Sequence, residues 1–342
     1  MKLVVVGHSL IHIRQINFFK EVARLGRQVT LFCPDRWGEQ AQDDYQASVG
    51  DSGGMLAVRP LPLAQTLELQ AGSPLDRLWF PDLPEELAKL ELGPEDWIYI
   101  QQEPESRLAH EVAALKLPAR KALFTWQNIS RPLDHFAYFA ALDHYDLVVC
   151  GNDGAETRMK HAGAKRTLVL PQVGVDTDHF QARPNVPRDI PVAYIGRPAP
   201  EKGVPQLLQA WPAAKILDWV DYRELPWRYS QAQIVVCFSQ DTDNWREQAM
   251  PFVACEAMAC GCAVIVSDAG SIPFWHNTYP GPQDPSPAVV VPQGSVETLG
   301  RAIRGLLAKP ALRQELADKG RPWVLRNLSS PIIARRLLDA FQ

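Results

Sequence analysis

The chain has 342 residues, which at about 150 residues per domain favours two domains over one. Hydrophobic residues make up 46% of the chain and charged residues 22%, which excludes a disordered, collagen-like or coiled-coil protein. The formal net charge is −4, so we expect no nucleic-acid partner, although a local basic pocket is compatible with this charge.

The six cysteines predict free thiols and no structural metal. Cys33, Cys150 and Cys237 lie in or beside apolar strand-like runs, and the other three lie in residues 255–262. No C-x-x-C or histidine pair completes a zinc set around them. Free thiols, a first apolar run too short for a signal peptide and no apolar run of about 20 residues predict a cytoplasmic protein.

The first half of the chain alternates short apolar runs with amphipathic helical patterns. We expect strands at 1–7, 29–33, 97–100, 122–126, 147–150 and 168–170, and helices at 16–25, 107–115 and 153–163. Asp153 is the expected cap of the last helix. This alternation predicts an open, doubly wound parallel sheet that binds its ligands beyond the carboxyl ends of the strands.

The first strand-to-helix turn, Gly7-His8-Ser9, contains a single glycine. A dinucleotide site would require G-x-G-x-x-G here, so a nicotinamide or flavin site is not supported. Two interpretations of Gly7 stay open: it serves turn geometry alone, or its backbone approaches a ligand phosphate.

A second series of strands and helices follows a proline-rich stretch at 171–190. We expect strands at 192–195, 215–220, 234–238 and 263–266, and helices at 204–211, 225–232, 254–259, 295–307 and 311–325. The fold is therefore expected to be α/β, with two facing Rossmann-like domains and a ligand cleft between them. The expected segments are a domain at 1–172, a linker at 173–190, a domain at 191–326, and a final helix at 327–342 that returns to the first domain.

Two cations occupy the first turn of the second series. Arg197 follows a strand end and Lys202 precedes a helix, in a turn that begins at Gly196. A planar guanidinium fork and a mobile ammonium suit a diphosphate, whereas two solvated surface cations are the alternative. The turn is not a Walker A loop, because G-x-x-x-x-G-K-[ST] fails.

Glu256 lies in the otherwise apolar segment 251–268, where we expect it to begin a short helix. A carboxylate in such a segment is costly unless a partner satisfies it. A ribose diol would be a suitable partner, and a satisfied carboxylate at a helix N-terminus is the alternative.

Segment 251–268 resembles the signature of the family 4 retaining glycosyltransferases, which have the two-domain GT-B fold. The family pattern is E-x7-E-A-M-A-C-G-x-P-V-I-x-S-D-x-G-G-x-P-E, and Glu256-Ala-Met-Ala-Cys-Gly261 matches it residue for residue. Further matches are Val264-Ile265, Ser267-Asp268, Gly270 and Pro273. The turn at 196–203 resembles the family's G-R-x-x-x-E-K-G turn with one extra residue, and 172–180 resembles its N-G-V-D-x-x-x-F linker. Residues 102–104 and 124–128 resemble one bacterial branch, so the resemblance extends over the whole chain.

The resemblance implies transfer of a hexose from a nucleotide-diphosphate sugar to an acceptor, with retention of the anomeric configuration. Arg197 and Lys202 would be catalytic residues that clamp the diphosphate, so that no metal or other cofactor is obligatory. Glu256 would hold the ribose. The other donor-binding residues implied are Gly7, Gly196, Glu247, Gln248, Gly270, Ser271 and Ile272. Residues 1–172 would form the acceptor side and 191–326 would bind the nucleotide sugar.

The chain departs from the family pattern in four places. The family's first glutamate falls on Gln248, with Glu247 beside it, so either residue could contact the sugar hydroxyls. Phe274 replaces the glutamate after the Gly-x-x-Pro turn, and His8 stands where the N-terminal loop usually has a glycine pair.

The family often carries a histidine near the end of the fourth strand, where this chain reads Gln101-Gln102-Glu103. Glu103 is a candidate for activating the acceptor, and His110, on a helix expected to face the cleft, is a second catalytic candidate. The stretch 204–233 is shorter than in the family, which predicts a missing or collapsed strand-helix unit and a trimmed nucleotide pocket.

Other functions stay open beside glycosyl transfer. Gln248 and Phe274 are compatible with a catalytically weakened nucleotide-sugar-binding protein, and the fold is compatible with a sugar-nucleotide epimerase. The acceptor could be a glycan, a lipid or a small molecule, and the oligomeric state is not predicted. Lys20, Arg24 and Arg27 give only a thin basic patch, so peripheral contact with the inner membrane leaflet stays open.

Overall fold

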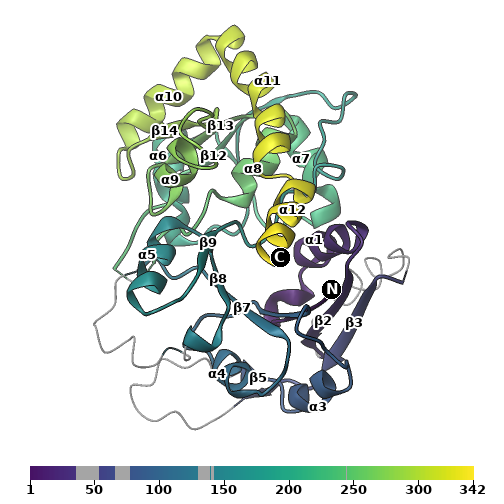
Figure 1. Ribbon diagram of the computed structural model, residues 1–342. Coiled ribbons are helices and arrows are strands. Elements are labelled where there is room, and N and C mark those ends of the chain that lie inside the picture. The colour runs from purple at the N-terminus through teal and green to yellow at the C-terminus, as the bar shows by residue number, and fades with distance from the viewer. Residues whose placement is uncertain (36–53, 66–77, 130–138, 140–141, 244) are drawn as a thin grey trace. The chain divides into compact units, whose positions relative to one another are not determined.

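The computed structural model describes residues 1–35, 54–65, 78–129, 139, 142–243 and 245–342. The chain divides into two compact units (Figure 1). Unit 1 contains Met1–Val173 together with Ile333–Gln342, and unit 2 contains Gly174–Ile332. Each unit is built on a parallel sheet with helices, which confirms the predicted α/β fold with two Rossmann-like parts.

The main sheet of unit 1 has the strand order β3-β2-β1-β6-β7-β8-β9 among the described residues, and every neighbouring pair is parallel. Its strands are β1 (Lys2–Val6), β2 (Gln28–Pro34), β3 (Leu56–Leu61), β6 (Trp97–Ile100), β7 (Arg120–Thr125), β8 (Leu147–Cys150) and β9 (Thr167–Val169). The order reverses between β1 and β6, so the turns after these two strands form the switch point where such sheets bind ligands.

Amphipathic helices accompany the unit 1 sheet. They are η1 (His8–Ile11), α1 (Ile13–Arg24), α3 (Leu83–Ala88), α4 (Arg107–Ala114), η3 (Leu142–His144) and α5 (Asp153–His161). A short antiparallel pair, β4 (Ala64–Gln65) and β5 (Leu78–Trp79), lies beside them. Helix α1 buries Ile16, Phe18, Phe19 and Val22, while Val4, Ile98 and Leu123 of the sheet belong to a continuous buried core.

The end of the chain is fixed in unit 1 by an aromatic cluster. The Phe341 ring stacks on Trp97 with 4.5 Å between ring centroids and contacts Tyr99 edge-on. The Trp97 indole Nε1 donates a hydrogen bond of 2.7 Å to the Phe341 carbonyl, and the Phe341 side chain is fully buried. The last helix, α12 (Ser330–Ala340), is therefore followed directly by a core residue that packs on β6 of unit 1.

The unit 2 sheet has the order β11-β10-β12-β13-β14 among the described residues, again with parallel neighbours. Its strands are β10 (Ile190–Ile195), β11 (Lys215–Leu217), β12 (Ala232–Cys237), β13 (Ala263–Ser267) and β14 (Val289–Val291). In chain order this is 2-1-3-4-5, a doubly wound arrangement whose switch point lies between β10 and β12.

The helices of unit 2 include two long surface helices near the end of the chain. In order they are η4 (Pro200–Lys202), α6 (Val204–Ala210), η5 (Tyr222–Glu224), α7 (Leu225–Gln231), α8 (Phe252–Ala259), α9 (Ile272–Asn277), α10 (Val296–Ala308) and α11 (Pro310–Asn327). Ser295 caps α10 by accepting from the Thr298 amide, and Leu299 and Ile303 pack into the unit 2 core.

The structure corrects three details of the sequence interpretation. Asn152, not Asp153, caps α5, because its side chain accepts from the Ala155 amide. Glu256 lies in the second turn of α8 and does not begin it. The edge strand β3 was not predicted, because Arg59 and Pro60 interrupt its apolar pattern, and an edge strand tolerates proline.

All six cysteines are free, as predicted, and all six are buried. Burial raises the pKa of Cys33 and of Cys237 to about 12, and that of Cys262 to about 11 despite the Arg188 guanidinium beside it. In the part of the chain that the structure describes, no helix is long and apolar enough to span a bilayer.

We predict that Phe341→Ala destabilises unit 1 by about 3 to 5 kcal/mol, because it empties a fully buried aromatic site. Gln342→Ala is the matched control, since the neighbouring side chain is exposed. Thermal unfolding followed by near-UV circular dichroism measures both variants. Equal unfolding midpoints for the two variants would contradict this role for Phe341.

Candidate functional site

The turn after β10 is pressed against the end of β12. The Gly196 amide donates to the Leu217 carbonyl at 3.0 Å, which fixes the start of the turn to the neighbouring strand β11. Gly203, with φ +68°, ends η4 and begins α6. A Cβ on Gly203 would lie only 1.9 Å from the Phe238 carbonyl oxygen. Only glycine combines this backbone conformation with so close an approach, so residues 196–203 lie against the carboxyl end of β12.

Lys202 forms a partly buried ion pair in this turn. Its Nζ lies 2.9 Å from Oε2 of Glu247, and the Ser239 hydroxyl donates to the same oxygen at 2.6 Å. The ammonium also lies 4.5 Å from the centroid of the Trp245 ring. The Lys202 side chain is 29% exposed and that of Glu247 only 11%. Since an ammonium has three N–H groups, Lys202 can keep Glu247 and still donate to a ligand.

Arg197 lies on the surface of the same turn. Its guanidinium is 3.0 Å from Oε1 of Glu201, and its side chain is 62% exposed. An exposed pair of this spacing contributes about 0.3 to 0.5 kcal/mol, so an anion can replace Glu201 at little cost. The backbone below is more fixed, because the Tyr194 hydroxyl donates to the Arg197 carbonyl at 2.7 Å. Burial raises the pKa of Tyr194, so this hydroxyl stays a donor.

The loop after β13 holds Glu247 in place. A Cβ on Gly270, whose φ is +51°, would lie 2.0 Å from the Glu247 carbonyl oxygen, and the Ser271 amide donates to that oxygen at 2.8 Å. The Gly270 amide donates to Oδ2 of Asp241 at 3.1 Å, and the Ile272 amide is bonded within its own turn. The amides of residues 270–272 therefore all have partners inside the protein, and the loop supports the Lys202–Glu247 pair.

Glu256 is enclosed beneath α7. It is 1% exposed, and the Tyr229 hydroxyl donates to its Oε2 at 2.9 Å. Tyr229 is itself fully buried. Of the two adjacent candidates for the sugar contact, the structure brings Glu247 to Lys202, whereas Gln248 follows in the loop with its side chain half-buried.

The switch point of the unit 1 sheet is polar. A Cβ on Gly7 would lie 3.1 Å from the Gln101 carbonyl oxygen, so the turns after β1 and β6 are adjacent. His8 continues this contact through Nδ1, which lies 3.0 Å from Nε2 of Gln102. The Gly7 amide donates to the Phe32 carbonyl at 3.3 Å. Gly7 is thus placed at the ligand-binding edge by its close contact with the end of β6.

Glu103 connects the ends of β6 and β7. Its Oε1 accepts from the Trp126 amide at 3.1 Å, and its Oε2 accepts from the Thr125 hydroxyl. Glu103 therefore lies at the same edge as Gly7. His110 lies in the first turn of α4 with its side chain half-buried, and its amide donates to the Ser106 carbonyl at 3.2 Å.

Sequence reasoning missed three residues that build these sites. Ser239 is the first polar residue after an apolar strand, and its place at a carboxyl end was a usable signal. Trp245 lies in an irregular loop, and Tyr229 lies on a short helix, so neither shows a pattern that marks it. Asp241 also supports the loop, because its Oδ2 accepts from the Gly270 amide and from Nε2 of Gln293.

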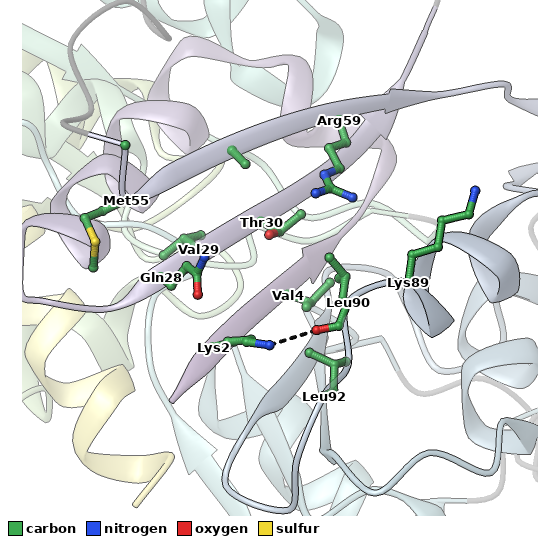
Figure 2. Close-up of a pocket in the computed structure, with 12 residues that line it drawn as sticks. Lys2, Val4, Gln28, Val29, Thr30, Met55, Arg59, Lys89, Leu90 and Leu92 are labelled. Carbon is green, nitrogen blue, oxygen red and sulfur yellow. Dashed lines mark hydrogen bonds between the residues drawn. The ribbon is translucent and has the colours of Figure 1, made fainter.

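A hollow of about 160 Å³ lies at the opposite edge of the unit 1 sheet (Figure 2). It is lined by Lys2 and Gln28, the first residues of their strands, and by Arg59 and Leu90. The Lys2 ammonium donates a hydrogen bond of 2.8 Å to the Leu90 carbonyl. This hollow is therefore separate from the edge that carries Gly7 and Glu103. Within the described ranges, no group of three His, Cys, Asp or Glu residues could hold a metal ion.

Residues 195–309 match the family described as Glycosyl transferases group 1. No curated protein matches the chain by sequence. Similar solved structures include HepE of Anabaena in complex with UDP (TM-score 0.71, 14% identity, 99% of each chain covered). Sucrose-phosphate synthase of Thermosynechococcus elongatus has a TM-score of 0.71 at 18% identity, with 100% of this chain and 98% of that chain covered.

A TarM variant of S. aureus, in complex with fondaparinux, alpha-GlcNAc-glycerol and UDP, has a TM-score of 0.67 at 9% identity, with 100% of this chain and 99% of that chain covered. These likenesses establish the GT-B fold, in agreement with the sequence prediction. The fold and the matched domain together support a glycosyltransferase of GT-B type.

We predict that Gly203→Ala destabilises unit 2 by more than about 3 kcal/mol, because strain at positive φ adds to a clash with the Phe238 carbonyl. Gly294→Ala is the matched control. Gly294 has a similar φ of +75° but no atom within 4 Å of an added Cβ, so its cost is about 1 to 2 kcal/mol. Urea unfolding measures both variants, and equal losses would contradict the close approach.

Proposed function

We propose that the protein is a family 4 retaining glycosyltransferase, which moves a hexose from a nucleotide-diphosphate sugar to an acceptor hydroxyl. The observation that carries this proposal is the Lys202–Glu247 pair at the switch point of unit 2, inside the matched segment 195–309. A cation beside a fixed carboxylate suits a diphosphate next to a sugar: the ammonium faces the phosphates and the carboxylate accepts from sugar hydroxyls.

We propose a uridine nucleotide as the first donor to test. HepE and the TarM variant were both solved with UDP, and HepE also with UDP-glucose. The side chains that would contact the diphosphate, Arg197 and Lys202, do not discriminate between bases, so GDP and ADP are the matched comparisons.

In the proposed reaction the bond between the anomeric carbon and the β-phosphate oxygen breaks. The bond to the acceptor oxygen forms on the same face of the sugar, and the proton of the acceptor hydroxyl passes to the departing diphosphate. Negative charge grows on the departing diphosphate, where Lys202 and Arg197 stabilise it more strongly than in the ground state. Two side chains thereby supply the charge neutralisation that a metal ion supplies elsewhere, and no metal is obligatory in this scheme.

The remaining candidates have supporting roles in this proposal. Glu256 was expected to hold the ribose, but it is 1% exposed and accepts from the Tyr229 hydroxyl, which fits the alternative of a carboxylate satisfied inside the protein. Residues 270–272 and Gly196 shape the loop and turn around the phosphates, and Gly7, at the switch point of the unit 1 sheet, is a further proposed donor contact. Glu103 and His110 act on the acceptor, which is a glycan, a lipid or a small molecule.

The test combines nucleotide binding with turnover. UDP, GDP and ADP are compared for thermal stabilisation of the protein, because a ligand of the native state raises the melting temperature. Transfer and hydrolysis are then assayed with sugars of the nucleotide that binds. Tight nucleotide binding without transfer to any acceptor would favour a binding protein, and absence of nucleotide binding would overturn the proposal.

We predict that Lys202→Met lowers kcat/KM for the donor by about 10²- to 10³-fold, because it removes a charge that faces the leaving group. Lys319→Met is the matched control, since Lys319 also pairs with a glutamate, Glu315, at 2.6 Å but on the exposed face of α11. Steady-state kinetics at saturating acceptor measure the effect. If the Lys202→Met variant is as active as the control variant, the proposed role of Lys202 in the reaction is wrong.

A further inference from the structure

Trp219 has two features that the fold alone does not require. Its side chain is 80% exposed, the largest fraction among the exposed large hydrophobic residues of the described chain. Its backbone has φ +48°, in the left-handed region. Such a conformation costs about 1 to 2 kcal/mol for a residue with a Cβ. The protein therefore holds a large aromatic ring in solvent on a strained backbone, which points to a ligand more than to packing.

Trp219 lies beside the turn that carries Arg197. Strand β11 ends at Leu217, which is paired in register with Ile195, the last residue of β10. The Gly196 amide donates to the Leu217 carbonyl. Arg197 and Trp219 therefore each lie within two residues of this hydrogen bond. The charge of Asp218, which lies between Leu217 and Trp219, contributes to raising the pKa of Tyr194, after burial and other nearby charges.

The Tyr194 hydroxyl in turn donates to the carbonyl of Arg197, in the turn that carries the two cations. Trp219 and Arg197 thus follow the carboxyl ends of two adjacent parallel strands, β11 and β10. A ligand whose phosphates bind Arg197 would extend its remaining part along this edge.

We infer that Trp219 stacks on the nucleobase of the donor. The inference rests on the proposed function, in which Arg197 and Lys202 hold the diphosphate. In a nucleoside diphosphate the base is the flat aromatic part beyond the ribose, and indole is the side chain with the largest surface for stacking on it. The structure is sparse here: between α6 and β12 unit 2 has a three-residue strand, a 3₁₀ turn and the seven-residue helix α7. In this short connection Trp219 is the exposed aromatic ring nearest to the turn that carries Arg197 in the strand register.

The experiment compares UDP with inorganic pyrophosphate by isothermal titration calorimetry. Trp219→Ala is expected to weaken UDP binding by about 5- to 100-fold, the range for loss of one base–aromatic stack. The affinity for pyrophosphate is expected to stay unchanged, because Trp219 does not touch the phosphates. Trp219→Phe is expected to retain most of the UDP affinity.

Trp227→Ala is the matched control. Trp227 is also exposed, at 51%, but it lies on α7, five residues before β12 begins at the amino edge of the sheet. Its replacement is expected to leave both affinities unchanged. Fluorescence provides a second readout, since UDP is expected to quench the emission of the wild type and of Trp227→Ala more than that of Trp219→Phe.

The outcomes separate the two proposals. Wild-type UDP affinity in Trp219→Ala overturns the inference and leaves the proposed function standing. An equal loss of UDP and pyrophosphate affinity also overturns it, because the residue then acts on the phosphate site. If the wild type binds neither UDP, GDP nor ADP, the proposed function fails, and the inference fails with it.

Discussion

The candidate donor site depends on one close approach between backbones. The absence of a side chain at Gly203 lets the turn after β10 lie against the Phe238 carbonyl, at the end of β12. This contact brings Lys202 over the loop that follows β12, where its ammonium pairs with Glu247 and the Ser239 hydroxyl donates to the same carboxylate oxygen. A second close approach, Gly270 against the Glu247 backbone, fixes the carboxylate from the other side. The close backbone approaches at Gly203 and Gly270 thus position the Lys202–Glu247 pair.

The strength of the site follows from partial enclosure. Lys202 and Glu247 are sheltered enough for their attraction to exceed that of a surface pair, yet the ammonium keeps access to solvent. Arg197 is the opposite case, an exposed cation whose partner is easily exchanged. A fixed charge and a mobile charge in one turn suit a ligand that must bind, react and leave.

Much of the fold followed from the sequence, because buried parallel strands are continuous apolar runs and the helices between them are amphipathic. The alternation predicted both sheets apart from the edge strands β3 and β14, and the spacing of Arg197 and Lys202 predicted a cationic turn at a strand end. What the sequence did not predict depends on contacts between distant segments. Whether Glu247 or Gln248 meets Lys202 is decided by the path of an irregular loop, and local patterns do not encode that path.

The same limit applies to Glu256 and Trp219. The residues around Glu256 suggested a helix start, but the extent of α8 places it one turn further in, under Tyr229. Nothing near Trp219 in the sequence distinguishes it from the other nine tryptophans. Its exposure and backbone conformation appear only when the short connection between β11 and η5 is seen in space.

The buried cysteines have a chemical consequence for the protein as a whole. Thiolate, not thiol, is the form that oxidants and alkylating agents attack, and desolvation is the main reason that each of the six stays protonated. Cys255, Cys260 and Cys262 lie within a few residues of Glu256. Oxidation of a reactive thiol there would damage the core of unit 2. The native fold uses its sulfur as packing volume, and resistance to oxidation is therefore a property of the folded state that ends when the core opens.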